Sequence, residues 1–314
     1  MHEGSRRAIV AALLANLGIA LAKFAAFAIT GAAAMLAEAI HSLADTGNQG
    51  LLFLGGARGK RAPTEQHQFG HGRERYFWAF VVALVLFSLG SLFAIVEGIE
   101  KLLHPHAVED PTLALAVLGI AFVLEGFSLR TAKREADRLR EGRTWWGFVR
   151  ASKNPELPVV LLEDTGALIG LVLAFGGIGL AAITGEAAFD AGATVLIGLL
   201  LGAIAVVLAI EMKSLLIGEA ASPEDQAAIR EAITTSPEVE HLIHLRTEHL
   251  GPEELLVAGK IDLTPGSEVQ SARAIDRVEA RIRERVPHAR VIYLEPDVLR
   301  VPDATSDPTG APDE

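Results

Sequence analysis

The 314-residue chain contains no cysteine, and this absence narrows the chemistry that it can perform. Without cysteine there is no disulfide, no thiolate metal site and no thiol nucleophile. Any metal ion bound by this protein must therefore be held by nitrogen and oxygen ligands. The absence of cysteine also means that the sequence gives no indication of whether the protein resides in an oxidising or a reducing compartment.

Charged residues are also scarce, at 21% of the chain, whereas half of the residues are apolar. The mean hydropathy is +0.35, a balance that suits a membrane protein with a soluble appendage better than a globular enzyme. The net charge of -11 is uneven: residues 1–217 carry a net charge of -1 and residues 218–314 a net charge of -10. Such an acidic C-terminal part is typical of a soluble surface and argues against a nucleic-acid partner.

Six stretches are long and apolar enough to cross a bilayer as helices, which takes roughly 20 residues each. They are residues 8–30, 33–56, 76–102, 113–131, 157–183 and 189–216. The first stretch follows two arginines, as a signal peptide would, but its apolar run is longer than the core of a signal. The sequence therefore predicts an α-helical membrane domain with six transmembrane helices over residues 1–217.

Basic residues predict the orientation of these helices. The connection after the second span holds five Lys or Arg residues, and the connection after the fourth holds seven, with Arg130 at the end of that span as an eighth. The connections after the first, third and fifth spans hold none. By the positive-inside rule, both basic connections and both chain termini lie in the cytoplasm. We expect a multi-pass integral protein of the plasma membrane.

Residues 218–301 have the pattern of a small soluble domain. Ser222 and Pro223 open a predicted helix, as N-cap and first helical residue. Two strands about a turn near residues 251–252, a second helix and a final strand follow. This order predicts an α+β domain, and residues 302–314, which lack apolar periodicity, a disordered tail.

Ionisable residues inside the apolar stretches mark the candidate functional site. His41 and Asp45 are four residues apart in the second span and therefore lie on one helix face. Glu163 and Asp164 interrupt the fifth span, where Val160 stands one turn earlier. Each buried charge costs at least about 2.5 kcal/mol on insertion, so such residues face a pathway or a partner. An imidazole and carboxylates could bind one divalent cation; taken singly, each carboxylate could instead form an interhelical hydrogen bond.

Other polar residues of the membrane domain give weaker signals. Asn48 can support the metal site or join two helices by a hydrogen bond. Lys23 lies near an end of the first span, where its ammonium could extend to the interface, and Glu125 lies within the fourth span with no evident partner. In the loop after the second span, His67 and His71 can hold a transient cation or can be ordinary exposed residues.

The motifs HSLAD at residues 41–45 and FGHGR at residues 69–73 resemble those of the cation diffusion facilitator family of divalent-metal transporters. Six spans and a soluble tail domain containing LRT at residues 245–247 and then GP at residues 251–252 extend the resemblance over nearly the whole chain. The Leu-Glu-Asp sequence at residues 162–164 is similar to the branch that includes the mitochondrial zinc-transporter member.

The resemblance implies a homodimer, a ferredoxin-like cytoplasmic domain and a metal site between the second and fifth spans. Carried over by position, His41, Asp45 and Asp164 are ligands, while a fourth ligand position falls on Val160. Glu163, Asn48 or a water could then complete the site.

The resemblance also extends in part to the loop after the second span. There His67 and His71 match the family's loop site, but Thr64 replaces its usual aspartate. The match therefore leaves open whether these two histidines bind a metal ion.

We therefore expect proton-coupled efflux of a divalent cation from the cytoplasm, Zn²⁺ first and Mn²⁺ or Fe²⁺ as alternatives, with no prosthetic group and no enzymatic activity. Metal and protons compete for the same ligands, and alternate opening of the site to the two sides turns that competition into antiport. A membrane-embedded metal sensor or scaffold is the alternative. An intramembrane hydrolase is disfavoured because the chain offers no nucleophile or general base beyond the expected ligands.

Overall fold

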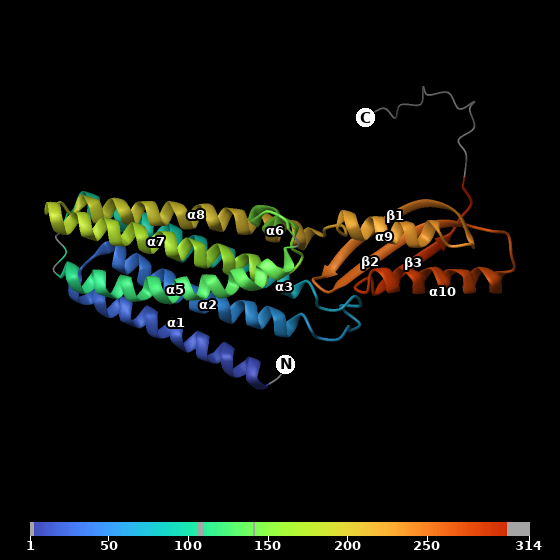
Figure 1. Ribbon diagram of the computed structural model, residues 1–314, viewed down its shortest axis with the longest axis horizontal. Helices are drawn as coiled ribbons and strands as arrows, with labels where there is room; N and C mark the ends of the chain where they lie inside the picture. Colours follow the sequence, from blue (N-terminus) through green and yellow to red (C-terminus); the bar gives the residue numbers. More distant parts are fainter. Residues whose placement is uncertain (1–2, 106–107, 109, 141, 300–314) are drawn as a thin grey trace, which may run out of the picture. The chain divides into compact units, whose positions relative to one another are not determined.

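The computed structural model describes residues 3–105, 108, 110–140 and 142–299 (Figure 1). The chain divides into two compact units, Met1–Ile217 and Gly218–Glu314. Each unit has its own hydrophobic core, and each is described here by itself. The tail predicted over residues 302–314 lies outside the described residues.

In the described part of the first unit, all regular secondary structure is helical. Its elements are α1 (Glu3–Thr30), α2 (Ala33–Arg58), α3 (Glu74–Val85), the π-helix η1 (Leu86–Leu92), α4 (Phe93–Leu103), α5 (Pro111–Leu139), α6 (Trp145–Ala151), α7 (Glu156–Thr184) and α8 (Ala188–Ile217). Two features differ from the sequence prediction. Helix α5 continues for two more turns past residue 131, and the short amphipathic helix α6 forms in the basic connection, where Thr144 caps its first turn.

Four helical stretches of the described chain are long and apolar enough to cross a membrane. They are the continuous rod of α3, η1 and α4, and the helices α5, α7 and α8. In α1 the described apolar stretch is the shorter segment Asn16–Thr30. Helix α2 has the length of a span, but the polar residues that mark the candidate site lower its hydropathy. The first unit is therefore a helical membrane domain.

Small residues allow the helices of this domain to approach closely. Two neighbouring glycines of α7 illustrate the effect: a Cβ atom added to Gly177 would overlap the side chain of Ala193 in α8, whereas a Cβ on Gly176 would meet nothing within 4 Å. In lipid, helices associate by such close packing, because the surrounding chains are as apolar as the helix surfaces. Gly177 therefore fixes the contact between α7 and α8.

A buried ion pair ties three segments of the membrane domain together. The Lys101 ammonium in α4 lies 2.8 Å from Asp190 Oδ2 in α8, and both side chains are at most 1% exposed. The same lysine donates to the Gly31 carbonyl at 3.0 Å. The Asp190 carboxylate accepts the backbone N–H groups of Ala33 at 2.9 Å and Ala34 at 3.2 Å, so it caps the first turn of α2 from another helix.

The rod of α3, η1 and α4 keeps a stripe of buried residues at intervals of four: Leu86, Gly90, Ala94 and Gly98. The two glycines lie against α8. A Cβ on Gly90 would be 3.2 Å from Leu201 Cδ1, and one on Gly98 would be 2.7 Å from a methyl carbon of Val195. The π-helical turns of η1 lie within this stripe.

The second unit is a three-stranded sheet with two helices. Its elements are α9 (Pro223–Thr234), β1 (Val239–Gly251), β2 (Glu254–Leu263), α10 (Glu268–Arg285) and β3 (Val291–Pro296). The strand order is β1-β2-β3, with β1 and β2 antiparallel and β2 and β3 parallel. Helix α10 is the crossover that a parallel pair requires. Apolar residues are buried at alternate positions along β2, and they share one hydrophobic core with residues of α9 and α10.

Local signals in this unit agree with the sequence prediction. The Ser222 hydroxyl accepts the N–H of Asp225, which confirms the predicted N-cap of α9. Between α10 and the loop before β1, Arg277 Nε donates to Glu238 Oε1 at 2.7 Å. This hydrogen bond lowers the pKa of the Glu238 carboxyl below its ordinary value of 4.5.

Candidate metal centre of the membrane domain

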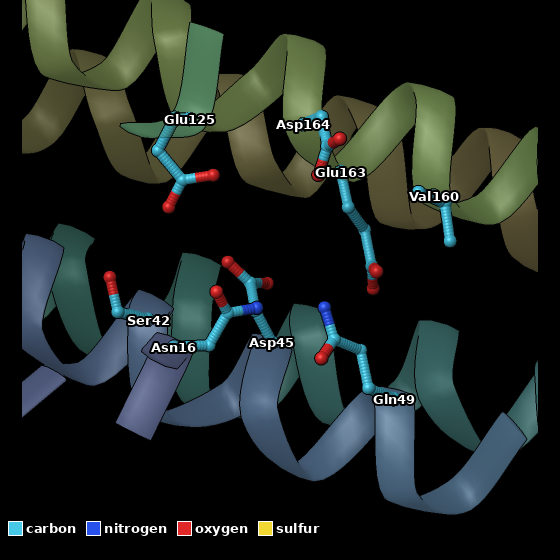
Figure 2. Close-up of a pocket in the computed structure, with 8 residues that line it drawn as sticks. All are labelled: Asn16, Ser42, Asp45, Gln49, Glu125, Val160, Glu163 and Asp164. Atoms are coloured by element: carbon cyan, nitrogen blue, oxygen red, sulfur yellow. The ribbon is translucent and has the colours of Figure 1, made fainter. Parts of the chain in front are cut away.

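Polar side chains of α2 and α7 face each other across a small cavity (Figure 2). The lining residues are Asn16, Ser42, Asp45, Gln49, Glu125, Val160, Glu163 and Asp164. The cavity measures about 10 Å³, which is the room that about one water-sized sphere needs. Four of the eight lining side chains are carboxylates and none is basic, so the cavity has the size and charge for a single cation.

Helix α2 supplies the lower wall in Figure 2, where Ser42, Asp45 and Gln49 point upward. His41 is 1% exposed, and its Nδ1 atom lies 3.6 Å from Asp45 Oδ1. Neither ring nitrogen of His41 has a hydrogen-bond partner among the described residues. The predicted pair of His41 and Asp45 thus stands together, one turn apart on α2.

Helix α7 supplies the opposite wall with Val160, Glu163 and Asp164 (Figure 2). Glu163 reaches toward α2, where the Asn48 amide donates to its Oε1 atom at 2.7 Å. Asn48 itself does not line the cavity and instead positions Glu163. Asp164 Oδ2 accepts the Ser128 hydroxyl of α5 at 2.9 Å. Val160 contributes only carbon to the lining, at the position where the sequence led us to expect a ligand.

The structure corrects the sequence interpretation of Lys23. Its side chain does not extend to an interface but is fully buried, and its ammonium lies 3.1 Å from Glu38 Oε2 and 2.7 Å from the Ser42 hydroxyl. A lysine buried in the membrane domain requires such partners. Gly170 of α7 leaves room for Glu38, since a Cβ there would be 2.7 Å from Glu38 Oε1. This network lies directly behind the cavity wall, because Ser42 belongs to both.

Sequence reasoning missed Glu125 as a cavity residue. Its carboxylate descends from α5 toward Asp45 and Asn16 (Figure 2). The sequence did show an ionisable residue within an apolar span, but it could not show whether Glu125 lies on the face of α5 that packs against the other helices. The carboxylates therefore come from three helices: Asp45 from α2, Glu125 from α5, and Glu163 and Asp164 from α7.

The loop histidines lie together outside this cavity. The ring centroids of His67 and His71 are 4.8 Å apart and the ring planes meet at 64°. The Thr64 hydroxyl accepts the N–H of His67 at 3.1 Å and stabilises the loop. His67 is exposed and His71 is half-buried.

The described side chains are not arranged as the ligands of a bound metal ion would be. In the part of the chain that the structure covers, no group of three or more His, Asp or Glu residues is gathered closely enough to hold a metal ion. The carboxylates around the cavity would have to rotate toward a cation to bind it. A divalent cation would offset the repulsion among ionised carboxylates that turn toward it.

Two family models match the chain and together cover most of it. The cation efflux transmembrane domain matches residues 9–217, and the cation efflux protein cytoplasmic domain, whose short name ZT_dimer denotes dimerisation, matches residues 221–297. The first match alone covers more than half of the chain. It includes every residue of the cavity.

Characterised relatives agree with these models. The chain is 32% identical to the mitochondrial proton-coupled zinc antiporter SLC30A9 of Mus musculus over 83% of its length and 46% of that protein. It is 30% identical to metal tolerance protein C4 of Arabidopsis thaliana over 86% of its length and 59% of that protein. It thus spans about half the length of these relatives. The cation-efflux pump FieF of Escherichia coli is 28% identical over 95% of this chain and 94% of the pump.

These matches assign the helical unit and the α/β unit to the two domains of one protein family. The first is an integral multi-pass membrane domain, and the second is a cytoplasmic domain of a kind associated with dimerisation. The family consists of transporters of divalent cations, so the prediction that the chain is not an enzyme is confirmed by its family. The chain belongs to the cation efflux family, also known as the cation diffusion facilitators.

Proposed function

We propose that this protein exports a divalent cation from the cytoplasm in exchange for protons, with Zn²⁺ as its first substrate and Mn²⁺ or Fe²⁺ as alternatives. The observation that carries the proposal is the cavity between α2 and α7. Asp45 lies on one wall, Glu163 and Asp164 lie on the other, and the space between them suits one ion. His41, beside Asp45, adds the nitrogen donor that suits zinc.

The proton coupling follows from the chemistry of these ligands. A neutral His41 and ionised Asp45 and Asp164 bind a divalent cation, and protons that bind the same groups weaken coordination. Ligand groups that accept either protons or one metal ion, exposed alternately to the two sides of the membrane, exchange one for the other. In this mechanism Asn48 holds Glu163 in place through its hydrogen bond.

The proposed topology has six spans and both termini in the cytoplasm, with a ferredoxin-like domain that joins two copies as a homodimer. It is supported by the clustering of the two basic connections. Arg75, at the start of α3, lies 2.8 Å from Glu156 Oε1 at the start of α7, so both connections reach the same end of the membrane domain. The positive-inside rule puts that end in the cytoplasm, and we expect the plasma membrane.

Transport into proteoliposomes tests the proposal. Vesicles with an acidic interior should take up Zn²⁺ faster than vesicles without a pH gradient. Asp45→Asn and Asp164→Asn should each lower uptake at least about tenfold, since even groups that only support a metal ligand cost that much when lost. Glu135→Gln is the matched control, because Glu135 is an exposed carboxylate of α5 that pairs with Arg138.

Two outcomes would contradict the proposal. Uptake that ignores the pH gradient and survives both substitutions would exclude this cavity as the transport site. Metal that binds one per subunit and never enters a sealed vesicle would identify the protein as a sensor or scaffold. Comparison of Zn²⁺, Mn²⁺ and Fe²⁺ in wild type and in Val160→His then measures how far the missing donor at position 160 sets the metal preference.

A further inference from the structure

One face of helix α5 contributes to the lining of the cavity and to its support. Glu125 lines the cavity, and Ser128, three residues later, donates its hydroxyl to Asp164 Oδ2 at 2.9 Å. Residues three apart lie on the same side of a helix, so these two polar groups form one short polar face. The residues beside them behave differently: Val123 and Phe127 are 69% and 73% exposed on the outer surface of the bundle.

The position of Glu125 calls for a positive partner. An ionisable group within an apolar span is costly unless it faces a partner or a pathway. No basic residue lines the cavity among those described, and the ammonium of Lys23 is already bound to Glu38 and Ser42. What Glu125 faces instead is Asp45, across the same space that we propose for the cation (Figure 2).

Of the expected ligands, His41, Asp45 and Asp164 leave a fourth donor to be supplied, and Glu163 already accepts the Asn48 amide at its Oε1 atom. Val160 offers no donor atom, and Asn48 is bound to Glu163 Oε1. A zinc site usually has four ligands, and harder cations take more oxygen ligands. A second observation concerns His41, which is 1% exposed and lies beside the cavity without lining it: among the described residues neither ring nitrogen has a hydrogen-bond partner, and Nδ1 lies 3.6 Å from Oδ1 of the cavity residue Asp45.

We propose that Glu125 coordinates the transported cation and supplies the donor that Val160 lacks. The binding site is then built from α2, α5 and α7, and movement of α5 relative to α2 makes or breaks a ligand contact. This inference rests on the proposed function, because it concerns the same cavity. It assigns to α5 a direct part in binding beyond the support that Ser128 gives to Asp164.

Equilibrium binding of Zn²⁺ and of Mn²⁺ to the purified full-length protein tests the assignment. Glu125→Gln keeps the size of the side chain and removes its charge, and it should weaken binding at least about tenfold. Glu135→Gln, on the same helix but exposed, should bind as wild type. The double variant Glu125→Gln with Val160→Asp restores a carboxylate on the opposite wall and should recover affinity to within about threefold of wild type.

The double variant separates coordination from a structural role. If Glu125 merely supported the packing of α5, Glu125→Gln would weaken binding by the same factor in the Val160→Asp background as in wild type, and that additivity would overturn the proposal. Binding by Glu125→Gln that equals the Glu135→Gln control would overturn it as well.

Asp45→Asn distinguishes this failure from failure of the proposed function. Loss of binding in Asp45→Asn with full binding in Glu125→Gln rejects only the role of Glu125. A wild-type protein that binds no divalent cation rejects both.

Discussion

The buried pair of Lys101 and Asp190 allows a prediction whose size can be worked from its contacts. Replacing Lys101 with Met leaves the Asp190 carboxylate with only the N–H groups of Ala33 and Ala34. Replacing Asp190 with Asn leaves the ammonium with the Gly31 carbonyl and no counter-charge. Removing one partner of a buried ion pair costs about 3–5 kcal/mol, because the other charge stays buried and unpaired.

The double variant Lys101→Met with Asp190→Asn should be far less destabilised than the sum of the two single variants. No unpaired charge remains, and the asparagine can still accept a backbone N–H at the start of α2. The remaining loss should be about 1–2 kcal/mol, the size of a weakened helix cap. The pair therefore predicts a coupling energy of several kcal/mol in a double-mutant cycle.

Unfolding of the full-length protein by SDS in mixed micelles measures these differences. Lys213→Met is the control, because Lys213 is exposed in α8. Single variants at Lys101 and Asp190 that stay within about 0.5 kcal/mol of this control would refute the reasoning, since that is the range of ordinary surface substitutions. Additive losses in the double variant would refute it equally, because they would show that the two charges do not interact.

Two further predictions concern the helix packing and the cytoplasmic domain. Gly177→Ala should destabilise the membrane domain by about 1–3 kcal/mol through overpacking, whereas Gly176→Ala should be neutral or slightly stabilising, as SDS unfolding of both would show. Arg277 lowers the pKa of Glu238, so their contact stabilises the folded state at pH values above the ordinary carboxyl pKa. This contribution is below about 1 kcal/mol, and it is lost as the pH falls through the lowered pKa of Glu238 in the folded protein. A carboxyl NMR titration of Glu238 should give a higher pKa in Arg277→Gln; equal values would contradict this cause.

Much of the candidate site could be predicted because helical spacing is a local property. His41 and Asp45 share a face of α2 at any arrangement of the other helices, and Glu163 and Asp164 mark α7 by their charge alone. Their meeting at one cavity follows from the packing of two helices with matching polar positions. The sequence of the second unit was equally informative, since caps, alternation and turn residues lie within a few positions of one another.

The contributions of Lys23, Glu125 and Asp190 depend on the rotation and depth of whole helices. Glu38 lies 15 residues beyond Lys23 and meets it only because α1 and α2 pack side by side. Apolar periodicity could not show the inward face of α5, because lipid accepts apolar side chains on every outer face. Asp190 caps a helix 157 residues earlier in the chain, which no local pattern records.

The π-helix η1 has a consequence for how the rod of α3 and α4 follows its neighbour. An α-helix turns about 100° per residue, so each step of four residues overshoots a full turn by about 40°, and three steps from Leu86 to Gly98 would carry the stripe about 120° around the rod. The wider turns of η1 take up part of this drift and keep Gly90 and Gly98 against α8. If the same residues continued as an unbroken α-helix, this drift would turn Gly98 away from α8, and a side chain in its place would separate the two membrane helices.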